Sequence, residues 1–339
     1  MKRKAVKIVT ILMYCAALFT MTACSINKTA EEKGSKKSEL VVQGDINGYD
    51  MDFDTDSTNV VGVVPWYIES EKATKLSIAK RVHLKWSESD LESEVSNYSS
   101  NVAGCPKLKE IEVEEGSETL FSHQGMLYKY GKKKEKELYA CPVMKDGEVT
   151  VPEGVLRIWS CAFNGCGEVT SVSIPKSVRG IGDAAFGNME KCSEIRVSKD
   201  NPYYESEDGV LYTKGKGVLI AYPSGKKAEI FQVPKGVKVI ASGAFMCANH
   251  LKKVVLPPSV TQLCESSFRQ CQKLKVIQAK GDISYLDRFA FYKTPAKREN
   301  FPGFSKREAD TWKNWRKEVD KNFIQKDSNW IHGYRGLGI

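Results

Sequence analysis

Histidine and cysteine are the residues of this chain that could carry out a reaction or hold a metal ion. The histidines are His83, His123, His250 and His332. None of them lies in a metal-binding helix motif or beside a nucleophile that it could activate. The sequence also lacks a phosphate-binding glycine loop. It therefore predicts no enzyme, no metal site and no bound cofactor.

One cysteine near the N-terminus is placed for a different reaction. A basic stretch ends at Lys7, and the apolar segment from Ile8 to Met21 is shorter than the roughly 20 residues that span a bilayer. A cleaved signal peptide is expected over residues 1–23. Met21-Thr22-Ala23-Cys24 resembles the lipobox of bacterial lipoproteins. This implies that Cys24 receives a diacylglyceryl group and anchors the mature chain at the extracytoplasmic face of the cell membrane.

The net charge does not point to nucleic acid as a partner. The formal charge is +9, but four of the basic residues lie in the first seven positions. Their removal on export leaves +5, spread over the whole mature chain. Such a small excess does not require a polyanionic ligand, so no nucleic-acid partner is predicted.

A repeat sets the positions of the remaining residues. A dipeptide that ends in phenylalanine recurs along the chain: Ala162-Phe163, Ala185-Phe186, Ala244-Phe245, Ser267-Phe268 and Ala290-Phe291. The spacing is identical in every interval except the one from Phe186 to Phe245, which is longer. Apolar residues also recur eight and five positions before the phenylalanine and three, six and nine positions after it. The residues of each column are expected to be buried and to stack on one another from coil to coil. Each residue then forms one rung of its column.

The full pattern is Pro-x-x-Val-x-x-Ile-x-x-x-Ala-Phe-x-x-Cys-x-x-Leu-x-x-Val-x-Ile-Pro. It resembles the BspA-like leucine-rich repeat family of bacterial surface proteins over about residues 100–292. The resemblance implies a curved solenoid with a parallel sheet on its concave face, and roles in adhesion or surface recognition. We therefore expect a leucine-rich-repeat solenoid, mainly of short parallel β-strands with irregular or short helical returns.

Two units are longer than the regular coil. The interval from Phe186 to Phe245 contains an insert, and a similar long unit comes earlier if Val102 is a degenerate phenylalanine position. Residues 125–128 match residues 209–212, and residues 138–142 match residues 219–223. Each insert is predicted to be a β-hairpin, with its turn at 131–134 in the first and at 214–217 in the second.

Four of the cysteines fall in the apolar columns: Cys105, Cys166, Cys192 and Cys271. Met, Ala or Leu takes their place in other coils, so they are expected to be small buried hydrophobic residues. A disulfide between Cys161 and Cys166, or between Cys264 and Cys271, is left open.

The flanks complete the predicted domain organisation. Residues 24–58 contain few large apolar groups and are predicted to be a flexible tether. Residues 59–100 are predicted to form an N-terminal cap, with helical spacing over 87–98, and residues 101–292 the solenoid. Residues 293–339 are predicted to be a C-terminal helical cap, with a helix over about 306–322.

The predicted binding face consists of strand positions that point outward between buried ones: Glu112, Ser173, Arg196, Val255 and Gln278. Such a surface suits a lipid-anchored cell-surface binding or adhesion protein with a protein or glycan ligand. Two alternatives stay open. One is an envelope enzyme whose catalytic part lies in 292–339, and the other is a purely structural surface protein.

Overall fold

The computed structural model describes residues 74–78, 80, 102, 105–131, 133–287 and 289–296, and the backbone of three further strands at 39–42, 62–63 and 82–83. Most of the predicted solenoid lies within these residues. Cys24, the predicted signal peptide, the helices expected at 87–98 and 306–322, and most of both caps lie outside the described residues.

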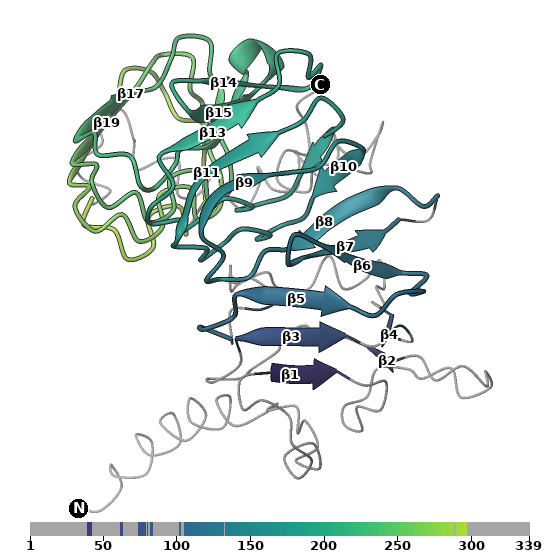
Figure 1. Ribbon diagram of the computed structural model, residues 1–339. Coiled ribbons are helices and arrows are strands. Elements are labelled where there is room, and N and C mark those ends of the chain that lie inside the picture. Colours follow the sequence, from purple (N-terminus) through teal and green to yellow (C-terminus); the bar gives the residue numbers. More distant parts are fainter. Residues whose placement is uncertain are drawn as a thin grey trace, which may run out of the picture.

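The repeats wind into coils whose longer strands form three separate parallel sheets, which we call the first, second and third stacks (Figure 1). The first consists of β1 (Glu39–Val42), β3 (Lys75–Ile78) and β5 (Glu110–Val113). The second consists of β9 (Gly147–Thr150), β11 (Val169–Ile174) and β13 (Glu194–Val197). The third consists of β17 (Ile230–Gln232), β19 (Lys253–Leu256) and β21 (Val276–Ala279).

A second set of strands, all but one of two residues, forms ladders further along each coil, and these strands are also parallel. They are β10 (Val155–Ile158), β12 (Gly180–Ile181), β18 (Val239–Ile240), β20 (Gln262–Leu263) and β22 (Tyr285–Leu286). The two-residue strands β2 (Gly62–Val63) and β4 (Val82–His83) pair in the same sense. Within the described residues the one helix is a short 3-10 turn at Lys214–Lys216. The predicted solenoid of short parallel strands with irregular returns is therefore confirmed.

The phenylalanine column forms the centre of the core. Phe163 and Phe186 stack with ring centroids 5.4 Å apart, and Phe268 stacks on Phe245 at 4.8 Å and on Phe291 at 5.3 Å. The first four of these rings are almost fully buried. Near-parallel rings at this spacing gain dispersion energy beyond their buried area. The predicted buried spine is confirmed.

Each long unit contributes three antiparallel strands where the sequence predicted two. The first insert has β6 (Leu120–His123), β7 (Met126–Tyr130) and β8 (Lys136–Ala140). The second has β14 (Tyr204–Glu207), β15 (Val210–Thr213) and β16 (Val218–Ala221). The last strand of each insert then pairs parallel with a solenoid strand, β8 with β10 and β16 with β18. The inserts therefore continue the sheets of the solenoid.

The unpredicted strands end in tight turns. Asp208 and Gly209 connect β14 to β15 with φ of +50° and +74°, and Gln124 and Gly125 connect β6 to β7 with φ of +52° and +73°. Two consecutive residues with positive φ are the mark of a type I′ hairpin turn, for which Asp-Gly is a favoured sequence. The Asp-Gly pair was thus a local signal for this strand pair.

The long interval between Phe186 and Phe245 is one long coil followed by one regular coil. The Tyr222 N–H donates to the carbonyl of Ala244 over 2.7 Å, as the Phe245 N–H donates to the carbonyl of Ser267 over 2.7 Å. The Tyr222 ring stacks on Phe245 at 5.2 Å. Tyr222 precedes Phe245 by the same spacing by which Phe245 precedes Phe268, so it is the missing rung of the column.

The first stack begins earlier than the predicted start of the solenoid at residue 101. Strand β3, in the predicted N-terminal cap, pairs with β5, and β1, in the segment 24–58 predicted to be a tether, pairs with β3. The polar composition of that segment concealed a strand of four residues. Strand β1 forms its hydrogen bonds with β3, which lies far along the chain. The composition of the segment gives no sign of such a distant partner.

Candidate binding surface

The register of the stacks places the five predicted face residues at equivalent positions. Ser173 pairs with Arg196 across β11 and β13, and Val255 pairs with Gln278 across β19 and β21. Glu112 occupies the same place in the first stack. Glu112 and Arg196 are exposed, and the other three are half-buried. The structure thus brings these residues together in two pairs, with Glu112 in a separate stack.

A second outward column lies two residues earlier in each strand, and the sequence reasoning missed it. In the second stack its members are Glu148, Ser171 and Glu194. In the third stack its members are Ile230, Lys253 and Val276. Side chains alternate between the two faces of a strand, so residues two positions apart lie on the same face. The alternation that predicted the first column therefore also predicts the second.

Charges on the second stack are paired with each other. The Arg196 guanidinium lies 2.8 Å from the carboxylate of Glu194 and 3.6 Å from that of Glu148, and it donates to Ser171 Oγ over 3.4 Å. The hydrogen bond to Glu194 is the main reason why the pKa of Arg196 is raised. The three charged side chains are exposed, so the ion pairs contribute little to stability. These contacts connect Arg196 on β13 with side chains on β9 and β11.

The third stack combines apolar and basic side chains. Ile230 is 58% exposed and Val276 is 41% exposed, on either side of Lys253 in the register. Ile230 and Val276 are two of the five large hydrophobic residues that are exposed in the described part of the chain. The third stack therefore differs from the second in presenting exposed apolar side chains on the same face as a cation.

The corner that leads into the third stack is also basic. Lys227 Nζ lies 3.1 Å from His250 Nε2, and Lys252 Nζ lies 2.6 Å from the carboxylate of Glu229. Desolvation, followed by the charges of Lys227 and Lys273, lowers the pKa of His250. At neutral pH this histidine is therefore neutral, and the lysines supply the positive charge.

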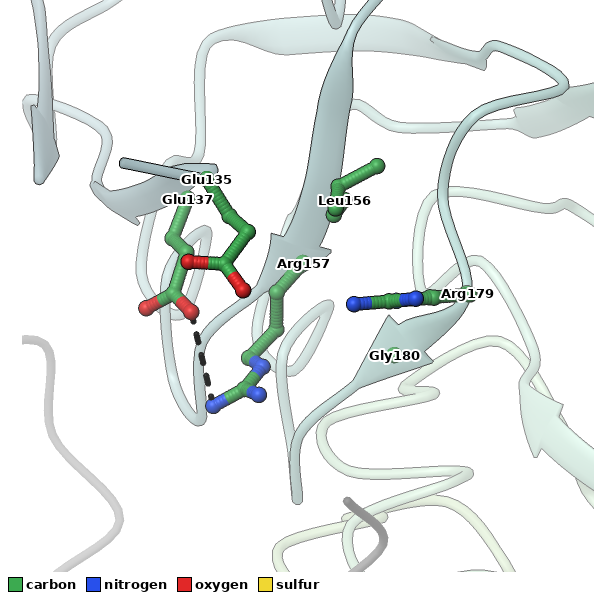
Figure 2. A pocket seen from close by; sticks show the side chains of 6 residues that line it. All are labelled: Glu135, Glu137, Leu156, Arg157, Arg179 and Gly180. Atoms are coloured by element: carbon green, nitrogen blue, oxygen red, sulfur yellow. Dashed lines mark ion pairs between the residues drawn. The ribbon is translucent and has the colours of Figure 1, made fainter. Parts of the chain in front are cut away.

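A small pocket lies on the sheet that contains β8, β10 and β12 (Figure 2). It is lined by Glu135, Glu137, Leu156, Arg157, Arg179 and Gly180. Glu137 is buried, accepts a hydrogen bond from Trp159 Nε1 over 2.8 Å, and lies 3.7 Å from Arg157 and 3.5 Å from Lys129. The pocket volume of about 10 Å³ is at the lower limit for one water molecule. This cluster therefore ties strands together and has no room for a metabolite.

The cysteines of the apolar columns are buried, as predicted. Cys161 and Cys166 do not form a disulfide with each other, nor do Cys264 and Cys271. Burial raises the pKa of the Cys161 thiol to about 12, so the thiol is protonated at neutral pH. In the part of the chain that the structure describes, no three histidine, cysteine or acidic side chains are grouped to hold a metal ion.

No helix within the described residues has the length and apolar character to cross a membrane.

The repeats match a known family of repeats. Six copies of the BspA type leucine rich repeat region match residues 135–207 and 222–313. No curated protein matches the chain.

Similar solved structures include the following three. A leucine rich cell surface protein from Faecalibacterium prausnitzii is 22% identical, with 63% of this chain and 53% of that chain covered and a TM-score of 0.36. A leucine-rich repeat protein from Eubacterium ventriosum is 19% identical, with 65% and 64% covered and a TM-score of 0.39. The pneumococcal vaccine antigen PcpA is 19% identical, with 68% and 58% covered and a TM-score of 0.45. The chain thus matches less than two thirds of each of these proteins.

Proposed function

Because the repeats of this chain belong to the BspA-type leucine-rich repeat family, we propose that the protein is a cell-surface binding or adhesion protein. A lipid on Cys24 holds it at the extracytoplasmic face of the membrane. The outward face of its strand stacks contacts a protein or glycan ligand.

The observation that carries this proposal is the alignment of outward side chains by the strand register. Three stacks each place two outward columns next to one another, and the side chains differ from stack to stack. The second stack presents paired charges, whereas the third presents apolar and basic groups. A repeat surface of this kind recognises macromolecules through many shallow contacts.

The binding face can be tested with matched double variants of residues 25–339. One variant carries Ser173→Arg and Val255→Asp on the strand face. The control carries Glu153→Arg and Lys235→Asp in exposed turns, and each pair leaves the net charge unchanged. All three proteins are screened on arrays of glycans and of surface proteins. A ligand that the wild type and the control retain and the face variant loses supports the proposal.

Two results would contradict it. Equal binding by all three proteins would place the site away from the strand face. A screen without any ligand would favour the alternative of a purely structural surface protein.

The anchor has its own test, because Cys24 lies outside the described residues. Radiolabelled fatty acid should enter the wild-type protein in bacterial cells and should not enter Cys24→Ser. Equal labelling of the two would remove the lipid anchor from the proposal and leave the binding face untouched.

A further inference from the structure

The outer edge of β17 has free backbone groups. The Val233 N–H donates to the carbonyl of Val255 over 3.0 Å, and the Lys253 N–H donates to that of Glu229 over 3.1 Å. Alternate residues of a parallel strand bond to the same neighbour, so the N–H and C=O groups of Ile230 and Gln232 point away from β19. Strand β17 ends its sheet, and these groups have no partner among the described residues.

The strand just before each insert is covered at the edge that faces away from its neighbour in the sheet. On β13, the Ile195 N–H donates to the carbonyl of Gly209 over 2.9 Å, and the Val197 N–H donates to Ser206 Oγ over 3.0 Å. On β5, the Ile111 N–H donates to the carbonyl of Gly125 over 2.9 Å. The hairpin of each insert therefore caps the strand before it and leaves the strand after it, β9 or β17, as an edge.

The two uncapped edges differ in their side chains. Strand β9 presents Glu148 and Thr150 outward, and charged or polar residues are the usual protection of an edge against pairing with other chains. At the place of Glu148, β17 has Ile230, which is 58% exposed. Strand β17 lacks the protection that β9 has, so its edge is open to an added strand.

The side chains near this edge indicate which chemical groups a binding partner would carry. Lys253 is the register partner of Ile230 on β19, and Lys227 lies three residues before Ile230 in the sequence. Lys252 is paired with Glu229. Positive charge therefore exceeds negative charge beside an apolar side chain. Free N–H and C=O groups in strand geometry are matched by another polypeptide backbone, whereas a polysaccharide or a lipid headgroup does not repeat that pattern.

We propose that the free edge of β17 binds an extended acidic segment of a partner polypeptide by strand addition. The backbone of the partner pairs with Ile230 and Gln232, an apolar side chain of the partner packs on Ile230, and its carboxylates face the lysines. The inference rests on the proposed function and names one partner class for it.

A ten-residue peptide of alternating valine and glutamate is the probe. Its affinity is measured by fluorescence anisotropy against an analogue of equal charge in which alternate residues are N-methylated, which removes the N–H groups of one edge. We expect the parent peptide to bind and the analogue to bind at least about tenfold more weakly, since the analogue cannot donate backbone hydrogen bonds to the carbonyls of Ile230 and Gln232. Raised salt should weaken binding of the parent peptide.

The matching protein variants are Ile230→Pro and Glu148→Pro. Proline is tolerated in an edge strand where the N–H faces solvent, so neither change breaks the ladder to the neighbouring strand. Ile230→Pro should abolish peptide binding, and Glu148→Pro on β9 should leave it intact. Thermal unfolding checks that both variants fold, and Ile230→Asp supplies a second edge variant that keeps every backbone bond of β17 and should also lose the peptide.

Three outcomes would overturn strand addition at β17: equal binding of the N-methylated peptide, undiminished binding to the folded Ile230 variants, or no binding of the parent peptide. If the array screen still yields a ligand that depends on Ser173 and Val255, the proposed function stands and only the strand addition fails. If the peptide binds as expected and the screen yields nothing that depends on the strand face, the strand addition at β17 stands and the proposed binding at the strand face fails.

Discussion

Single residues in this solenoid contribute according to their place in the coil. Phe245 lies between Tyr222 and Phe268 in the aromatic column, with no exposed surface. Phe245→Ala leaves a cavity between two rungs and should lower the free energy of unfolding by about 3–5 kcal/mol. Denaturant unfolding measures the loss. Tyr203→Ala, at a tyrosine that is 44% exposed, is the control and should change little. Similar effects of the two variants would show that the column is not the core.

Asp183 predicts how stability depends on pH. Its Oδ1 is buried and has no hydrogen-bond partner in the described part of the chain. Burial, and then the charge of Glu265, raise the pKa of Asp183 to about 7. The folded state therefore binds a proton more tightly than the unfolded state does, and stability should fall as pH rises from about 4 to about 7.

Asp183→Asn removes this titration. The variant should unfold at a higher temperature than the wild type at pH 8, and the difference should disappear near pH 4, as thermal unfolding across this range can measure. Asp208→Asn, at an exposed turn position, is the control. A variant that is no more stable than the wild type at pH 8 would show that the carboxylate is solvated in the folded protein.

At the scale of elements, the turn of each insert is fitted against the strand before it. A Cβ atom at Gly209 would lie 3.0 Å from the Cα of Glu194 on β13, whereas a Cβ at Gly215 would have nothing within 4 Å. The two glycines have almost the same φ, +74° and +75°. Gly209→Ala and Gly215→Ala therefore impose the same backbone strain, and only the first adds a close contact.

We expect Gly209→Ala to lower the unfolding midpoint further than Gly215→Ala does. Denaturant unfolding of both variants isolates the contribution of the close approach to β13, because the strain cancels. Equal midpoints would mean that the turn moves away from β13 at no cost, and that capping of β13 by the insert is weak.

At the scale of the whole molecule, the identity of Tyr222 as a rung makes one coil removable. Excision of residues 187–222 joins Phe186 to Pro223 and gives Phe186 the same spacing to Phe245 that Phe245 has to Phe268. The Ala184 N–H already donates to the carbonyl of Ser242 over 3.1 Å, so the two coils on either side of the excision are in contact. Stability in a solenoid comes from contacts between neighbouring coils, and the shortened protein should fold.

Deletion of residues 201–223 is the matched control. It removes the rung at Tyr222 without restoring the register, so the coils on either side no longer align. The in-phase protein should keep a cooperative unfolding transition and a strand-rich circular dichroism spectrum, and the out-of-phase protein should lose both. If both deletions fold equally well, Tyr222 is not a rung of the column.

The sequence by itself determined the rungs. Each coil packs on an equivalent coil, so a residue and its contact recur at a fixed spacing that can be found without coordinates. Even the degenerate position was identified correctly. The Cys105 N–H donates to the carbonyl of Val102 over 3.0 Å, as the Cys166 N–H donates to that of Phe163 over 3.1 Å. The alternation along each strand likewise identified the outward column from Glu112 to Gln278.

Tertiary structure decided where the repeats are interrupted and what lies beside each interruption. The place of Tyr222 in the aromatic column, the parallel pairing of β8 and β16, the pairing of β1 and the free edge of β17 all depend on neighbours that share no fixed spacing. The backbone N–H and C=O groups of a strand are the same in every sequence. The sequence therefore does not indicate whether a partner strand or solvent covers them. Only the packed chain shows that β13 is capped by its hairpin and that β17, with Ile230 at its edge, is not.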